Sequence, residues 1–175
     1  MKKIAFLCLA LALQGCAGLN QQDPRTAKLQ WQDKSLSMDI NGLTSHGPFK
    51  DKMNINSIAV NGEVLLIGQS TSPQLTEQFL GLVKQIPNVK KVFNEIESRP
   101  LLDLGQISQD TLLTTRVKAE MIASKRLSDV TVKVLTENGV VYLLGYVNQT
   151  QADAATHIAR NVSGVKKVVR FLHIV

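Results

Sequence analysis

The residues best suited to covalent or metal chemistry are two cysteines, Cys8 and Cys16, and three histidines, His46, His157 and His173. A histidine acts as a general base or a metal ligand when partner side chains converge on it. These three have no helical or strand spacing to one another, and no carboxylate pattern accompanies them. We therefore predict no metal site, no Ser-His-Asp arrangement and no cofactor. Only Cys16 lies in a motif with chemical content.

The first fifteen residues have the pattern of a secretory signal. Lys2 and Lys3 precede an apolar run, Ile4 to Leu13, that is too short to span a bilayer. The ending Leu13-Gln14-Gly15-Cys16 resembles a bacterial lipobox, which implies that Cys16 becomes the first mature residue and carries palmitate-type acyl chains on its sulfur and amine. The alternative is an ordinary signal with a cysteine near the cut by chance.

The membrane localisation and the net charge of the mature chain follow from cleavage before Cys16. Ala17 follows Cys16. The same resemblance implies that an Asp at this position would retain a lipoprotein at the inner membrane. We therefore predict an outer-membrane anchor, with the protein facing the periplasm. Without Lys2 and Lys3, 18 of the 20 basic residues remain against 14 acidic ones. Residues 17–97 hold 8 basic and 8 acidic side chains, and residues 98–175 hold 10 and 6, so the basic excess belongs to the C-terminal half.

The two halves are copies of one another. The run Asn61 to Gly68 recurs 77 residues later as Asn138 to Gly145, and Val89-Lys-Lys-Val92 recurs as Val165-Lys-Lys-Val168. Asp33, Leu36 and Ile40 likewise recur as Asp110, Leu113 and Val117. This organisation predicts a signal peptide over 1–15, a lipidated linker over 16–28, domains over 29–97 and 108–175, and a linker over 98–107 that contains Pro100 and Gly105. We expect separate cores, so that a fragment from about residue 98 folds alone.

Each copy is predicted to fold as helix, strand, strand, helix, strand. Asn61-Gly62 and Asn138-Gly139 are the strongest hairpin signals, because both residues of a tight turn need positive φ. The expected strands are 55–60, 64–67 and 90–97 in the first copy, and 130–135, 140–144 and 166–174 in the second. The expected helices are 31–43 and 73–85, then 108–126 and 150–161. The fold class is α+β, with two helices covering one face of each three-stranded mixed sheet.

This order resembles the BON domain. The resemblance rests on the αββαβ order, on the Gly that ends the second strand (Gly68, Gly145) and on the helix that runs into Val-Lys-Lys-Val. BON domains occur in pairs in OsmY-like periplasmic proteins, and the lipobox adds a resemblance to dual-BON outer-membrane lipoproteins. It implies a non-enzymatic protein that binds anionic phospholipid, such as phosphatidylglycerol or cardiolipin, through the first helix of its second domain. It also implies a role in outer-membrane integrity near the cell-division site.

The residues of the second copy's first helix are compatible with that role. Leu113, Val117 and Met121 form the expected core stripe. Apolar and basic side chains then fall on its other faces, as a helix lying on anionic headgroups requires. The predicted phospholipid-binding residues are Leu112, Arg116, Ala119, Ile122, Ala123 and Arg126. The alternative is that Leu112 and Ile122 bury against the other domain.

The first copy differs from the second. Its opening helix is interrupted by Gly42 and its half of the chain is charge-neutral, so we expect a structural or protein-contacting role. Trp31 could lie at the membrane interface, but we expect it to pack on the domain core instead. Two hypotheses stay open: a lipid-binding module, or an adaptor that docks on an outer-membrane protein or assembly machine and uses lipid only as its anchor. We expect no nucleic-acid partner, because aromatic residues are few and the chain is exported.

Overall fold

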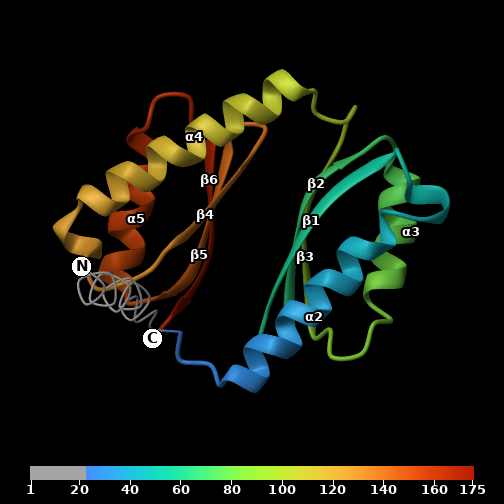
Figure 1. Cartoon of the computed structure of the whole chain (residues 1–175), viewed down its shortest axis with the longest axis horizontal. Helices are drawn as coiled ribbons and strands as arrows, with labels where there is room; N and C mark the ends of the chain where they lie inside the picture. Colours follow the sequence, from blue (N-terminus) through green and yellow to red (C-terminus); the bar gives the residue numbers. More distant parts are fainter. Residues whose placement is uncertain (1–22) are drawn as a thin grey trace, which may run out of the picture.

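The computed structural model describes residues 23–175, so the predicted signal and Cys16 lie outside the described residues. Helix, strand, strand, helix, strand occurs twice in that range, which confirms the α+β class and the element order (Figure 1). The first copy consists of α2 (Ala27–Leu43), β1 (Met53–Val60), β2 (Glu63–Ser70), α3 (Pro73–Val83) and β3 (Lys91–Ser98), with a 3₁₀ turn η2 (Gly47–Phe49). The second consists of α4 (Leu104–Ala123), a 3₁₀ turn η3 (Lys125–Leu127), β4 (Lys133–Glu137), β5 (Val140–Val147), α5 (Gln149–Asn161) and β6 (Lys167–Ile174).

Both copies contain the same mixed sheet. The central strand pairs antiparallel with the strand before it and parallel with the strand after it, in the orders β1-β2-β3 and β4-β5-β6. The hairpin turns have positive φ at both residues, 54° and 79° at Asn61-Gly62 and 51° and 75° at Asn138-Gly139. These values are those of the tight turn that the Asn-Gly pairs predict.

The first helix of each copy is tied to its hairpin by a buried aspartate. Asp33 accepts hydrogen bonds from the backbone N–H groups of Asn61 at 2.8 Å and Gly62 at 3.0 Å. Asp110 accepts the equivalent bonds from Asn138 at 2.7 Å and Gly139 at 2.8 Å. The repeat indicates that these aspartates are equivalent. In the structure each of them fixes the position of its helix relative to the hairpin turn of the sheet.

Each domain has a core between its helices and its sheet. In the first domain Leu36 and Ile40 of α2 pack with Phe79 and Val83 of α3 on the sheet. In the second domain Leu113, Val117 and Met121 of α4 take part in the matching cluster. The predicted core stripes are therefore confirmed.

The two sheets also pack against each other, with the helices outside (Figure 1). A third cluster joins the inner faces of β2 and β5, and Phe93 of β3 meets Phe171 of β6 edge to face at 5.2 Å. Its buried members are Val60, Leu65, Ile67, Val140, Tyr142, Leu144 and Phe171. The expectation of fully separate cores was incomplete, because β2 and β5 are apolar on both faces and bury both.

Several predicted boundaries shift. The unpaired connection between the domains is shorter than 98–107, since β3 includes Ser98 and α4 begins at Leu104. Asp103 starts α4 early because it forms a reciprocal capping box with Gln106. Helix α2 likewise begins at Ala27 instead of residue 31, capped by Thr26. Strand β4 begins only at Lys133, three residues later than predicted.

Candidate functional site on helix α4

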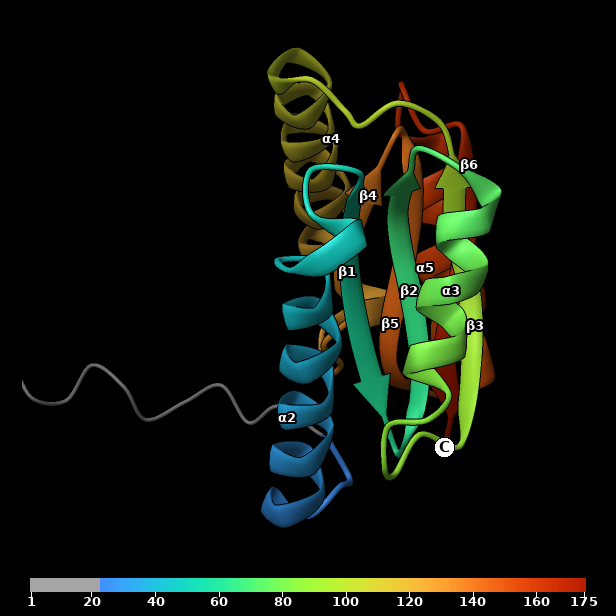
Figure 2. The ribbon, with the colours of Figure 1, turned by 90° about the vertical axis from the view of Figure 1, so that its right-hand side faces the viewer.

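The orientation of α4 is set by its buried stripe. Asp110, Leu113, Val117 and Met121 face the sheet, so the remaining faces of the helix point away from it. Figure 2 shows α4 on the same side of the molecule as α2, with α3 on the opposite side. No helix among residues 23–175 is both long and apolar enough to cross a membrane.

All six residues predicted to contact phospholipid are exposed. Leu112 is 58% exposed and Ile122 is 85% exposed, so neither buries against the first domain. Leu112, Arg116, Ala119 and Ala123 are spaced by four, three and four residues, which places them on one stripe of the helix. Large exposed apolar side chains on the outside of a helix, next to arginine, are compatible with a lipid surface.

One of the six is not on the helix. We expected a helix through Arg126, but α4 ends at Ala123 and Arg126 lies in the turn η3. Ser124 adopts an extended backbone that ends α4, and Leu127 is buried in the second domain's core. Arg126 is therefore presented from the turn that follows α4, at the same end as Ile122 and Ala123.

Sequence reasoning missed Lys166. Leu112 and Arg116 line a shallow depression of about 290 Å³ together with Lys166, the 163–164 loop and the Asn138-Gly139 turn. Lys166 Nζ donates to Asn138 Oδ1 at 3.1 Å, which holds the ammonium group at this depression. The repeated Val-Lys-Lys-Val motif could have pointed to a lysine at this place. However, the motif alone does not indicate which of its two lysines lies next to α4.

The charge of this surface is positive. Asp110 also lines the depression, but its two oxygens accept the N–H groups of the hairpin turn. Among the described residues no carboxylate lies within ion-pair distance of Arg116, Arg126 or Lys166. The cations are therefore available to an anion from outside the chain.

Trp31 does not occupy the place that we favoured for it. Its side chain is 68% exposed, and Met38, seven residues later on the same side of α2, is 63% exposed. The residues of α2 that fill the core of the first domain are instead Leu36 and Ile40.

The histidines lie on three separate elements. His46 and His157 are exposed in the loop after α2 and on α5, whereas His173 of β6 stacks on Tyr146 with ring centroids 5.1 Å apart. Within residues 23–175 no group of three or more histidine, cysteine or acidic side chains could hold a metal ion.

Comparison with known families decides the relationship. Residues 33–100 and 109–175 each match the BON domain. The chain belongs to the BON-domain family. Its two BON domains are those that the internal repeat predicts.

Named relatives extend the comparison to the whole chain. It is 38% identical to the outer membrane lipoprotein DolP of Haemophilus influenzae, over 97% of this chain and 94% of that protein. It is also 38% identical to the 21 kDa hemolysin of Actinobacillus pleuropneumoniae, over 87% and 79% of the two chains. The osmotically-inducible protein Y of Escherichia coli is 34% identical over 60% of this chain and 54% of that protein. These relationships support an outer-membrane lipoprotein with two BON domains. The lipobox predicts the lipoprotein, Ala17 its membrane and the repeat its two domains.

Proposed function

We propose that this BON-domain lipoprotein binds anionic phospholipid through the outer surface of α4 and the turn η3, on the periplasmic side of the outer membrane. The observation that carries the proposal is the combination, on α4, the turn η3 and the adjoining Lys166, of large exposed apolar side chains with cations that no carboxylate of the described chain pairs with. Leu112 and Ile122 would enter the headgroup boundary while Arg116, Lys166 and Arg126 meet phosphate. Anchoring by acylated Cys16 would keep this surface near the bilayer.

In this proposal the depression beside α4 takes the headgroup. Arg116 offers a planar fork of donors that suits phosphate, and Lys166 adds a second charge at the same depression. Phosphatidylglycerol and cardiolipin are the expected lipids, since a zwitterionic headgroup would bring its own cation. A role in outer-membrane integrity near the division site would follow from binding these lipids.

The test is co-sedimentation of the non-acylated form spanning residues 23–175, which contains both domains and every contact described above. We expect binding to phosphatidylglycerol vesicles that weakens with salt, and little binding to phosphatidylcholine. Leu112→Glu, Arg116→Glu and Arg126→Glu should each weaken binding about fivefold or more, since one cation at an anionic surface contributes about 1 kcal/mol. Lys28→Glu and Lys50→Glu, exposed in the first domain, are the matched charge controls.

A protein-docking role is the second candidate function, supported by the exposed Trp31 and Met38 on α2. Such a surface, in the charge-neutral domain, suits a protein partner in an outer-membrane assembly machine better than anionic lipid. Equal binding to both kinds of vesicle, or unchanged binding by folded Leu112→Glu, would reject the lipid proposal and favour this one.

A further inference from the structure

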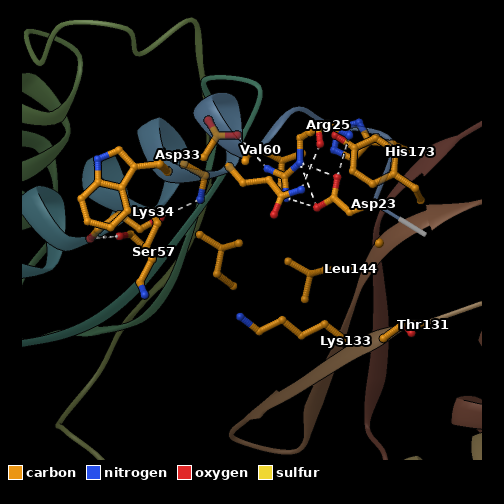
Figure 3. A pocket seen from close by; sticks show the side chains of 18 of the residues that line it. Asp23, Arg25, Asp33, Lys34, Ser57, Val60, Thr131, Lys133, Leu144 and His173 are labelled. Atoms are coloured by element: carbon orange, nitrogen blue, oxygen red, sulfur yellow. Dashed lines mark hydrogen bonds and ion pairs between the residues drawn. The ribbon is translucent and has the colours of Figure 1, made fainter. Parts of the chain in front are cut away.

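A cavity of about 690 Å³ opens between the two domains, away from the surface of α4 described above. One wall comes from α2 and β1 of the first domain, and the other from β4, β5 and β6 of the second (Figure 3). Volumes of this size are typical of small-molecule sites, which are often found between domains.

The cavity combines free cations with an apolar floor. Lys34 approaches from the first domain and Lys133 from the second (Figure 3), and neither has a carboxylate within ion-pair distance among the described residues. Val60 and Leu144 line it from the inter-sheet cluster. Trp31 lines the same cavity while staying largely exposed, so it belongs to the rim.

The other charged lining residues are Arg25 and two aspartates, which together keep one negative charge. Arg25 forms ion pairs with Asp23 and with Asp33, the latter at 2.7 Å. Its guanidinium also lies 5.5 Å from the centre of the Tyr146 ring, which fixes it against the wall. With Lys34 and Lys133 the lining has a formal net charge of +1, and these two lysines are the lining cations that no carboxylate of the described residues pairs with.

His173 adds an unused polar atom. Its ring stacks on Tyr146, and its Nε2 is buried without a hydrogen-bond partner among the described residues. Buried polar atoms are nearly always partnered, so an unpartnered one in a cavity wall is a reason to look for a ligand.

The internal repeat supplies a comparison within the same molecule. In the first domain Gln69 and Glu97 pair across β2 and β3 at the positions that Tyr146 and His173 occupy across β5 and β6. There Gln69 Nε2 donates to Glu137, and the backbone N–H of Leu102 reaches Gln69 Oε1 at 3.5 Å. Both ends of the inter-sheet space are bridged, since Asn61 Nδ2 donates to Tyr146 Oη at 3.0 Å. The end at Gln69 is acidic, whereas the end at Tyr146 carries Lys34 and Lys133 and has the cavity beside it.

We propose that the inter-domain cavity binds one molecule of an anionic amphiphile, with its phosphate or carboxylate group held by Lys34 and Lys133. The alkyl part would lie on Val60 and Leu144, under Trp31. This site is separate from the phospholipid surface on α4, and its occupancy does not depend on that surface.

Trp31 is the chain's single tryptophan, so its fluorescence reports on the rim directly. We would titrate residues 23–175 with lauroyl lysophosphatidylglycerol and with laurate, each below its critical micelle concentration. A saturable change with either probe is expected, and the probe that binds tells phosphate from carboxylate. Lysophosphatidylcholine of the same chain length and glycerol 3-phosphate should each bind at least about tenfold more weakly, because one lacks the net charge and the other the chain.

Variants locate the site. Lys133→Ala should weaken binding about tenfold or more, and Lys133→Arg should restore most of it. Arg116→Ala, on the α4 surface, should leave this affinity unchanged. The proposal is overturned if lysophosphatidylcholine binds equally well, if Lys133→Ala has no effect, or if Arg116→Ala removes binding while Lys133→Ala does not.

Discussion

The carboxylate of Asp110 accepts a hydrogen bond from the backbone N–H of Gly139 at 2.8 Å, which joins the first helix of the second domain to its hairpin. The second oxygen accepts a hydrogen bond from the N–H of Asn138, so one buried side chain satisfies both donors of the turn. This arrangement determines which residues of α4 face outward.

We expect Asp110→Asn to destabilise the protein by about 1.5–3 kcal/mol. The amide that replaces one carboxylate oxygen cannot accept, so one turn N–H loses its charge-assisted bond. Urea unfolding would measure the change. Asp39→Asn, at an exposed position of α2, is the control and should stay within about 0.5 kcal/mol of wild type.

Gly68 and Gly145 were expected to end the central strands, but each lies two residues before the end of its strand, at φ of 139° and 149°, a region that side chains rarely adopt. A Cβ on Gly68 would collide with the carbonyl oxygen of Asn54, and one on Gly145 would lie 2.8 Å from that of Thr131. Gly68→Ala should therefore cost about 3 kcal/mol or more, and Gly145→Ala less. Gly81→Ala on exposed α3, where nothing lies within 4 Å, should stabilise by about 0.5–1 kcal/mol. Thermal unfolding that ranked Gly145→Ala as the worse variant would disprove this reading.

Burial raises the pKa of Glu137 above its ordinary 4.5, against a smaller opposing effect of the hydrogen bond from Gln69. The folded protein therefore holds this proton more tightly than the unfolded chain does. Stability should fall as pH rises through 4.5 toward the folded pKa, and the penalty is complete above it. Glu137→Gln keeps an acceptor for Gln69 but removes the charge. We expect its stability gain over wild type to grow from about pH 4 to about pH 7; a difference independent of pH would contradict the assignment.

Cys16→Ser should release the protein from the membrane or leave it unprocessed. Acyl chains contribute about 0.8 kcal/mol per buried CH₂, and two or more give essentially stable attachment. Fractionation should find wild type in the outer membrane and the variant in the soluble or precursor fraction. Recovery of the wild-type protein in the inner membrane would refute the outer-membrane localisation inferred from Ala17.

The fold could be predicted from local patterns, because the Asn-Gly turns and the spacing of Leu113, Val117 and Met121 specify their own elements. The placement of one domain on the other could not. We predicted a strand over 64–67 with one face covered by helices, because nothing in its pattern says that a second sheet covers the other face. Lys166 and the inter-domain cavity depend on that packing or on loop geometry, so sequence reasoning missed both. The exposure of Trp31 was missed for a different reason: we favoured a core position because tryptophan is a large apolar residue, and the helical pattern alone does not fix which face it lies on.

We infer that the outer face of α4 is the part of the molecule that enters the lipid boundary. The most direct measurement is paramagnetic broadening of backbone amides in residues 23–175, caused by a spin-labelled lipid in phosphatidylglycerol bicelles. We expect the strongest broadening along α4 and η3, around Leu112, Ala119 and Ile122, and its loss in Leu112→Glu. Strongest broadening along α2 around Trp31 and Met38, or on α3 and α5, would contradict it.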